Sequence, residues 1–157
     1  MQVTQTLKQY HSEIQRCIKE FLKSRSAELV NVNDWGEDVC NRLRDFSVEG
    51  KMIRGGLVLW TYFLFRNEPS ENVVIAAAAM EMFQSSFLVH DDIMDRDYKR
   101  RGAPTVFAQY QQLAKDKGIE NEKHFGEAMG ICAGDMSFYF AFQILTHLDL
   151  PSEMKEK

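Results

Sequence analysis

Hydrophobic residues recur at steps of three and four in the first part of the chain, which is the spacing of one face of an α-helix. Residues 7–22 follow this pattern, and their opposite face is charged. Asn33 or Asp34 can cap a second helix that continues to about Phe46. The apolar face of the first helix consists of Leu7, Tyr10, Ile14, Cys17, Ile18, Phe21 and Leu22.

The same spacing predicts further helices, separated by short turns. One opens at the glycine-flanked turn of residues 49–56 and runs through residues 57–64, and the others cover residues 71–97, 106–113 and 125–148. A turn at residues 67–70 precedes the second of these, with Ser70 as its N-cap. Pro151 ends the last helix before a charged tail at residues 152–157. Every predicted element is helical, so we expect an all-α fold, a helical bundle with its site between facing helices.

The last predicted helix, at residues 125–148, is apolar on nearly all sides, so we expect neighbouring protein to surround it. Within it, the apolar run at residues 128–145 contains Gly134, Asp135 and Ser137. These interruptions argue against a membrane span, and we expect no stable membrane insertion.

Composition and charge exclude some functions. The 157 residues are enough for one domain with a hydrophobic core. The net charge is -4 and the basic residues are scattered or interleaved with acidic ones, so nucleic acid is not an expected partner. Cys17, Cys40 and Cys132 form no Cys-x-x-Cys pair, and they are expected to be reduced thiols. Since the polar N-terminus also lacks the apolar core of an export signal, we expect a cytoplasmic protein.

An acidic cluster follows the apolar part of the helix at residues 71–97. Asp91 and Asp95 are four residues apart and therefore lie on one helix face, while Asp92 lies about 100° round the axis. Two carboxylates one turn apart need a cation, and Mg²⁺ suits them because it completes its shell with water and phosphate oxygens. A solvated helix end with local ion pairs is the alternative. The apolar helix before the cluster favours a metal site at the mouth of a buried helix.

Two basic segments are candidates for phosphate binding. Lys99, Arg100 and Arg101 follow the acidic cluster, and arginine offers a planar pair of donors to phosphate oxygens. Lys51 and Arg54 lie three residues apart on the first turn of a predicted helix, so they project together. The free backbone amides of a helix N-terminus also attract anions. The alternative for this second segment is a solvated basic turn.

These motifs resemble those of the isoprenyl diphosphate synthases, the head-to-tail prenyltransferases such as farnesyl and geranylgeranyl diphosphate synthase. Residues 91–95 and 100–105 match the family pattern Asp-Asp-x-x-Asp followed by Arg-Arg-Gly-x-Pro-Thr. Residues 50–54 resemble the family's Gly-Lys-x-x-Arg-Pro element, except that Gly55 stands where the family usually has proline. The resemblance implies the isoprenoid synthase fold and Mg²⁺-dependent condensation of an allylic diphosphate with isopentenyl diphosphate.

The resemblance also implies roles for individual residues. Asp91 and Asp95, supported by Asp92, would bind Mg²⁺ and so help the allylic diphosphate to leave. Arg100 would bind that allylic diphosphate. The residues assigned to isopentenyl diphosphate are Lys51, Arg54, Gln84 and Arg101. From the residues alone, a core amide bonded to the backbone is the alternative for Gln84.

Phe83, Ser86 and Phe87 are the candidates for control of product length. Phe83 and Phe87 lie eight and four residues before Asp91, so they would line a groove below the metal end of the helix, although core packing explains them equally well. By the resemblance, Ser86 and Phe87 occupy the two positions where bulk limits the growing prenyl chain. One small and one bulky residue there imply a short-chain product of intermediate size. His90 is expected to pack rather than to bind the metal, because Mg²⁺ prefers oxygen.

The resemblance covers nearly the whole chain but only about the first half of a family member, because a second aspartate-rich motif is absent. Residues 1–157 are therefore expected to form the N-terminal portion of a polyprenyl synthetase domain, inactive alone. Exposed apolar surface would favour a homodimer, and residues 133–135 resemble a segment of the family's dimer-interface helix. The alternative is a non-catalytic helical subunit or scaffold of a heteromeric prenyltransferase. A terpene cyclase is disfavoured, because cyclases lack the two basic motifs.

Overall fold

The computed structural model describes residues 2–66 and 70–151, with side chains described from Gln9 onward. The predicted turn at residues 67–69 and the charged tail at residues 152–157 lie outside this part of the chain. Six helices and one short hairpin follow one another along the described residues. Their bounds are α1 Gln2–Leu29, α2 Trp35–Val48, α3 Ile53–Phe65, α4 Glu71–Met94, β1 Lys99–Arg100, β2 Ala103–Pro104, α5 Val106–Asp116 and α6 Glu122–Leu145.

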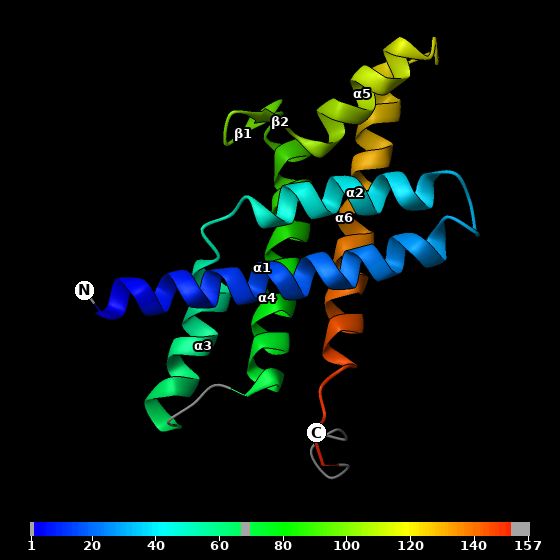
Figure 1. Cartoon of the computed structure of the whole chain (residues 1–157). Coiled ribbons are helices and arrows are strands. Elements are labelled where there is room, and N and C mark those ends of the chain that lie inside the picture. Colours follow the sequence, from blue (N-terminus) through cyan, green and yellow to red (C-terminus); the bar gives the residue numbers. More distant parts are fainter. Residues whose placement is uncertain (1, 67–69, 152–157) are drawn as a thin grey trace.

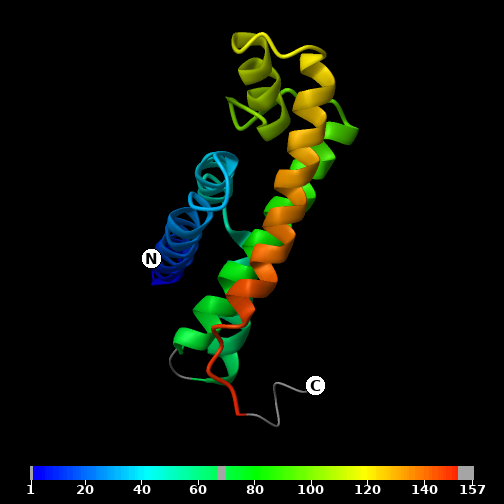
Figure 2. The same cartoon turned by 90° about the vertical axis from the view of Figure 1, so that its right-hand side faces the viewer.

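The helices form two layers. Helices α4 and α6 are long neighbours that run in opposite directions, and α1 and α2 cross them as a second layer (Figure 1). The view in Figure 2 shows that this second layer covers one side of α4 and α6. Helix α3 packs on the N-terminal half of α4, while α5 packs on α6. The hairpin lies at the C-terminal end of α4, which brings it close to α2 and α5 (Figure 1).

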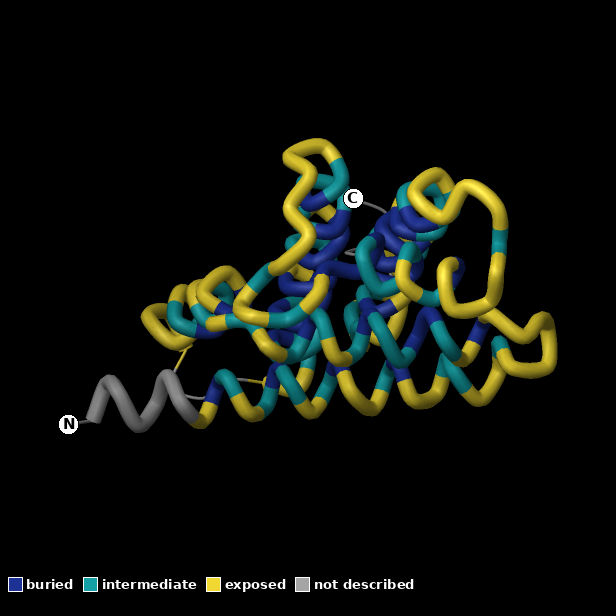
Figure 3. The backbone as a smooth tube through the Cα atoms, turned by 90° about the horizontal axis from the view of Figure 1, so that it is seen from above, coloured by how far each residue is buried: buried dark blue, intermediate teal, exposed yellow. Residues whose placement is uncertain are grey.

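The hydrophobic core lies where the two layers meet, as the buried positions in Figure 3 show. Ile14, Ile18 and Leu22 of α1 are buried, as the apolar face of the first predicted helix requires. They belong to one cluster with Leu43 of α2 and Leu59 of α3. Small side chains on α4 let these neighbours approach its backbone closely. The buried small residues of α4 are Ala77, Ala78, Ala79, Ser85 and Ser86.

The predicted all-α helical bundle is confirmed, and several helix ends differ from the prediction by about one turn; α6, for example, covers Glu122–Leu145 rather than residues 125–148. Helix α1 is longer than residues 7–22. Helix α4 ends at Met94 rather than at Asp97, because Asp95 forms its C-cap and Arg96 adopts a left-handed conformation with φ 59°. The chain thus leaves the helix immediately after the last aspartate of the acidic motif.

The hairpin β1–β2 was not predicted. Its strands have two residues each, which is too short for any hydrophobic period to be visible. Arg101 and Gly102 form its turn with φ angles of 53° and 85°. Thr105 closes the hairpin, since its backbone N–H donates to the carbonyl of Tyr98 and its hydroxyl donates to the carbonyl of Asp97.

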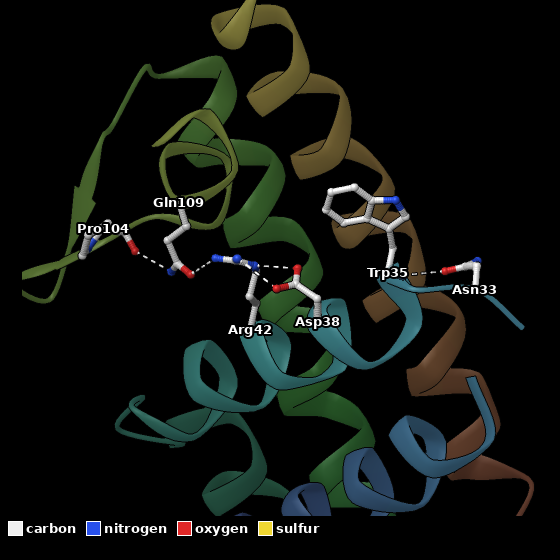
Figure 4. Close-up of polar contacts among 6 residues, drawn as sticks. All are labelled: Asn33, Trp35, Asp38, Arg42, Pro104 and Gln109. Carbon is white, nitrogen blue, oxygen red and sulfur yellow. Dashed lines mark hydrogen bonds and ion pairs between the residues drawn. The ribbon is translucent and has the colours of Figure 1, made fainter. Parts of the chain in front are cut away.

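The structure decides between the two caps predicted for α2. The Asn33 carboxamide oxygen accepts a hydrogen bond from the backbone N–H of Trp35 at 2.9 Å (Figure 4). Asp34 occupies the cap position but makes no side-chain capping bond, and the same is true of Ser70 at the start of α4. Asn33 therefore caps the first turn of α2.

The prediction that protein surrounds α6 on nearly all sides is wrong for the described residues. One face packs on α4 and α5 through Gly126, Gly130, Ala133 and Ser137, all of them buried. The opposite face is open to solvent, and Tyr139 is 69% exposed. The exposed apolar face, as we name it here, consists of Ile131, Tyr139 and Phe142 of α6 with Met80 and Phe87 of α4.

Two described helices are long and apolar enough to cross a membrane by length and composition, namely α4 and α6. They pack on each other and on the rest of the bundle. This packing identifies them as core helices, because a buried helix of a folded domain has the same composition as a membrane span.

Glycines of the helices give a test of this packing. A Cβ at Gly126 would lie 2.7 Å from the carbonyl oxygen of Phe107 and 2.8 Å from Cβ of Gln111, so α5 would have to move. Gly126→Ala should lower the free energy of unfolding by about 1–3 kcal/mol. Gly56 of α3 has no atom within 4 Å of such a Cβ. Gly56→Ala should therefore raise the free energy of unfolding by about 0.5–1 kcal/mol, through helix propensity. Urea unfolding followed by circular dichroism measures both, and equal effects would contradict the close packing of α5 on α6.

Candidate functional site

The C-terminal end of α4 carries the three aspartates of the acidic motif. Asp91 is half-buried, Asp92 is buried and Asp95 is exposed. The turn from Asp91 to Asp95 is intact, because the backbone N–H of Asp95 donates to the carbonyl of Asp91 at 2.8 Å. The Cα–Cβ bonds of Asp91 and Asp95 therefore leave the helix on one face. Their position at a helix C-terminus also favours a cation nearby, since the helix dipole is negative there.

Asp92 forms an ion pair with Arg100 of the hairpin. Its Oδ1 accepts hydrogen bonds from Arg100 Nε at 2.7 Å and from Arg100 Nη2 at 2.6 Å. The Asp92 side chain is 1% exposed, and its Oδ2 has no hydrogen-bond partner among the described residues. Burial raises the pKa of Asp92 above its ordinary value, while the Arg100 guanidinium opposes this rise. This ion pair links the hairpin to the C-terminal end of α4.

This pairing concerns two residues to which the resemblance assigns different roles. Asp92 is the supporting metal ligand and Arg100 the ligand of the allylic diphosphate in that assignment. In the structure they contact each other, and Arg100 remains partly accessible, with 27% of its side chain exposed. The structure thus brings together the acidic and basic motifs that lie eight residues apart in sequence.

Arg101 extends from the hairpin turn to the end of α2. Its Nη1 donates to the carbonyl of Phe46 at 3.3 Å. A Cβ at Gly50 would lie 3.3 Å from Arg101 Nη2, so the guanidinium lies against the backbone of Gly50, next to Lys51. A cavity of about 50 Å³ remains between α2 and the hairpin, large enough for one or two waters. The two basic segments predicted from the sequence are therefore neighbours in space.

The turn that carries Lys51 and Arg54 is held by α1 on its N-terminal side. Gln15 Nε2 donates to the carbonyl of Val48 at 2.6 Å, and His11 Nε2 lies 2.9 Å from the carbonyl oxygen of Gly50. Lys51 and Arg54 are exposed at the start of α3, as a phosphate site requires. Arg54 lies on the first turn of α3 as predicted, whereas the prediction is wrong for Lys51, which precedes the helix because the left-handed Met52 forms the N-cap.

A contact that the sequence did not reveal lies on the other side of this turn. Glu81 of α4 is 7% exposed, and its Oε1 accepts a hydrogen bond from the backbone N–H of Gly55 at 2.7 Å. Gly55 directly follows Arg54. A single glutamate in an apolar helix has no sequence signal that distinguishes such a contact from a solvated side chain.

The candidate chain-length residues separate into two environments. Phe83 makes edge-to-face contacts with Phe138 at 5.3 Å and with Phe142 at 5.0 Å between ring centroids. Phe87 lies 6.3 Å from Phe138 and is 53% exposed. These rings form an aromatic seam between α4 and α6, whereas Ser86 is buried on another side of α4. Of the two positions before the motif, Phe87 alone belongs to this seam.

Gln84 and His90 are the two further residues of α4 for which the sequence predicts a role. Gln84 is half-buried on α4, two turns before Asp91. His90 packs on α6, where its Nε2 lies 3.3 Å from the carbonyl oxygen of Ile131 and 3.4 Å from Oδ1 of Asp135. These contacts agree with the packing role predicted for His90.

A polar bridge between α2 and α5 supports the hairpin from its other side (Figure 4). Arg42 donates to both carboxylate oxygens of Asp38, at 2.8 Å and 2.9 Å, and its Nη1 donates to Oε1 of Gln109 at 2.7 Å. Gln109 Nε2 in turn donates to the carbonyl of Pro104 at 2.9 Å. The Arg42 guanidinium also lies over the Tyr110 ring, 4.5 Å from its centroid. The four-residue spacing of Asp38 and Arg42 could have revealed their pair, but nothing in the sequence points to Gln109.

The described residues contain no group of three His, Cys, Asp or Glu side chains gathered around one metal position. The donor set still suits Mg²⁺, because Asp91 and Asp95 offer oxygen ligands and Asp92 keeps one buried oxygen without a partner. Mg²⁺ takes one or two carboxylates from a protein and its remaining ligands from water and phosphate. The residues therefore fit a metal that binds together with a phosphate compound.

The fold and this end of α4 define the class as all-α proteins of the isoprenoid synthase fold. The polyprenyl synthetase family model matches residues 37–156, and the chain belongs to that family. It is 39% identical over 99 residues to a short chain isoprenyl diphosphate synthase of Methanocaldococcus jannaschii, which is 63% of this chain and 25% of the relative. It is also 39% identical over 102 residues to a farnesyl diphosphate synthase of Geobacillus stearothermophilus, covering 64% of this chain and 29% of the relative.

A solved structure is similar over almost the whole chain. It is the geranylgeranyl pyrophosphate synthase of Corynebacterium glutamicum, complexed with isoprenyl diphosphate and magnesium. The TM-score is 0.85 at 32% identity, and the match covers 96% of this chain and 44% of that one. The chain thus spans less than half of this structure and a smaller share of the curated relatives named above.

The ion pair of Asp92 and Arg100 gives a pH-dependent prediction. Arg100→Met should lower the free energy of unfolding by about 3 kcal/mol at pH 7, because it leaves a buried carboxylate unpaired. Without Arg100, burial alone acts on Asp92 and keeps its pKa in the folded state above that of the unfolded chain. The folded state then takes up a proton first as the pH falls, so the loss is full at neutral pH and shrinks at acidic pH.

Urea unfolding between pH 4 and pH 8 measures this effect. The double variant Asp92→Asn/Arg100→Met is the control, because it has no carboxylate at this position and should lose the pH dependence. A loss in Arg100→Met that stays constant over this range would contradict the buried pair.

Proposed function

We propose that this chain binds the two substrates of a head-to-tail prenyltransferase that condenses an allylic diphosphate with isopentenyl diphosphate. The observation that carries the proposal is the contact of Arg101 with Gly50, next to the turn of Lys51 and Arg54. It unites two basic segments beside the carboxylates at the end of α4. Membership of the polyprenyl synthetase family and the substrates implied by the relatives' names support it.

Isopentenyl diphosphate would bind to the basic pair of Lys51 and Arg54 at the start of α3. The free amides of this helix end add donors to the two side chains. Arg101 approaches the same position from the hairpin, and Gln84 contributes an amide from α4. Arg100 would bind the allylic diphosphate with the part of its guanidinium that Asp92 leaves accessible.

The carboxylates of Asp91 and Asp95, with Asp92 in support, would hold Mg²⁺. When bound, the metal supplies positive charge that stabilises the departing diphosphate. The magnesium of the Corynebacterium glutamicum structure and the oxygen ligands at the end of α4 support this assignment. The ion pair with Arg100 keeps the Asp92 carboxylate fixed at this helix end.

The aromatic seam between α4 and α6 would receive the prenyl chain. Its rings exclude water from the allylic cation, which water would otherwise quench. Phe87 and Phe83 would limit product length from this seam. Ser86 faces the core, so its effect on length would act through the packing of α4 rather than through contact with the chain.

Asp91→Ala tests the metal role. The variant should abolish Mg²⁺-dependent binding of geranyl diphosphate while leaving the helical circular dichroism unchanged, because it removes a metal ligand from a half-buried helix end. Isothermal titration calorimetry with and without Mg²⁺ measures this. Isopentenyl diphosphate should still bind to the variant, since none of its proposed ligands, Lys51, Arg54, Gln84 and Arg101, has been removed.

Asp97→Ala is the matched control, because it removes an exposed aspartate that lies outside the acidic motif. Its affinity for geranyl diphosphate should stay within about twofold of the unsubstituted chain. Equal Mg²⁺-dependent binding by Asp91→Ala would overturn the metal assignment. Absence of binding of both diphosphates to the unsubstituted chain would overturn the proposed function.

The exposed apolar face predicts self-association. Large apolar side chains are exposed on both α4 and α6, and exposed apolar patches are the kind of surface that protein covers in an assembly. We expect a homodimer by light scattering, and Tyr139→Lys should shift the mass towards the monomer by placing a charge on this face. Lys19→Glu, which changes an exposed residue of α1, should leave the mass unchanged. A dilute monomer of the unsubstituted chain would contradict the proposal.

The described cysteines agree with a reducing compartment, and we propose the cytoplasm. Cys17, Cys40 and Cys132 are free thiols. Burial raises the pKa of Cys40 to about 11, so this thiol stays protonated and unreactive at neutral pH.

A further inference from the structure

Glu81 is a buried acidic residue that belongs to none of the motifs discussed above. It lies on α4 ten residues before Asp91, and its side chain is 7% exposed. A buried carboxylate is unfavourable unless it is hydrogen-bonded or paired. Its Oε1 accepts the Gly55 N–H at 2.7 Å, and this bond is charge-assisted because the acceptor is a carboxylate.

The start of α3 needs such a contact. Its N-cap position is Met52, which has a left-handed φ of 48° and makes no side-chain capping bond. A left-handed conformation is unfavourable for a residue with a Cβ, so the surrounding structure must maintain it. The contacts of α1 reach the backbone before this point, at Val48 and Gly50. The Glu81 bond reaches it on the other side, at Gly55.

The absence of a side chain at Gly55 makes this contact possible. A Cβ at this position would lie 2.8 Å from the carbonyl oxygen of Ala77, 2.9 Å from Cδ1 of Ile14 and 3.1 Å from Cγ of Glu81. The missing side chain lets the backbone of α3 approach α4 closely enough for its amide to reach the carboxylate. A proline at this position has no N–H and could not make the bond.

We propose that Glu81 is a positioning residue for the diphosphate that binds to Lys51 and Arg54. Its carboxylate replaces the missing N-cap and holds the first turn of α3 in one orientation, which fixes the backbone of Arg54 three residues after Lys51. The negative charge also suits a helix N-terminus, where the dipole is positive. This inference rests on the proposed function, because it concerns the ligand of that site.

Two substitutions separate the hydrogen bond from the volume of the side chain. Glu81→Gln keeps an oxygen acceptor, and Glu81→Met removes it at similar volume. Hydrogen exchange of the amides at residues 53–56 should accelerate about tenfold or more in Glu81→Met, because the loss of one charge-assisted bond corresponds to at least a tenfold change in an opening equilibrium. In Glu81→Gln the same amides should remain protected.

Titration calorimetry with isopentenyl diphosphate then measures the effect on the site. Glu81→Met should weaken binding about tenfold, and Glu81→Gln should restore most of the affinity. Mg²⁺-dependent binding of geranyl diphosphate at the C-terminal end of α4 should not change in either variant.

Ser137→Ala is the control for a general loss of stability. Its hydroxyl is buried and donates to the carbonyl of Met82 at 3.1 Å, so the variant loses one buried hydrogen bond between α6 and α4 while the bond of Glu81 to Gly55 stays in place. It should lower the free energy of unfolding without changing the affinity for isopentenyl diphosphate. If it weakens binding as much as Glu81→Met does, a positioning role for Glu81 is excluded.

The outcomes distinguish this inference from the proposed function. Unchanged exchange at residues 53–56, or unchanged affinity in Glu81→Met while the unsubstituted chain binds isopentenyl diphosphate, overturns the role of Glu81 alone. Failure of the unsubstituted chain to bind isopentenyl diphosphate overturns the proposed function, together with the ligand part of this inference.

Discussion

Close approach of its neighbours to α4 is the constraint on which the rest of the structure depends. Gly55 of α3 lies against a backbone carbonyl of α4, and Gly134 of α6 lies against the His90 ring. The hydroxyl of Ser137 bonds to a carbonyl of the same helix. Larger residues at these contacts would separate the helices and with them the elements that carry the basic side chains. The small residues of the chain are thus a condition for the site as well as for the core.

Two buried carboxylates of α4 hold the two basic segments of the site in place through hydrogen bonds. Asp92 holds the hairpin through Arg100, and Glu81 holds the start of α3 through Gly55. The bridge from Arg42 through Gln109 to Pro104 supports the hairpin from the other layer. In the first two cases an acceptor on α4 holds a neighbouring segment, and in the third a donor on α5 holds the hairpin. Cationic side chains on such short segments need this support, because short strands and turns are marginally stable by themselves.

The fold was largely predictable from the sequence, because long helices repeat their hydrophobic spacing several times. Tyr10, Ile14, Ile18 and Leu22 of the predicted apolar face are buried positions of α1, while the Leu7 side chain lies outside the described part of the chain. The end of α4 was predicted three residues too late, because the left-handed Arg96 has no signature of its own. The candidate aspartates and basic residues were found by motif. Supporting contacts outside the motifs were not found, because residues such as Arg42 and Gln109 lie 67 positions apart and meet only through the packing of α2 on α5.

The glycines at the contacts of α6 also limit where residues can be inserted into or deleted from this chain. Gly126, Gly130 and Gly134 are spaced by four residues, so they lie along one side of the helix and face α5 and then α4. Insertion or deletion of a single residue between them would rotate the following part of α6 by about 100°. A side chain would then stand where only a hydrogen atom fits, and two contacts would be lost together. Length variation among related chains should therefore be confined to connections such as residues 117–121, where no such register has to be kept.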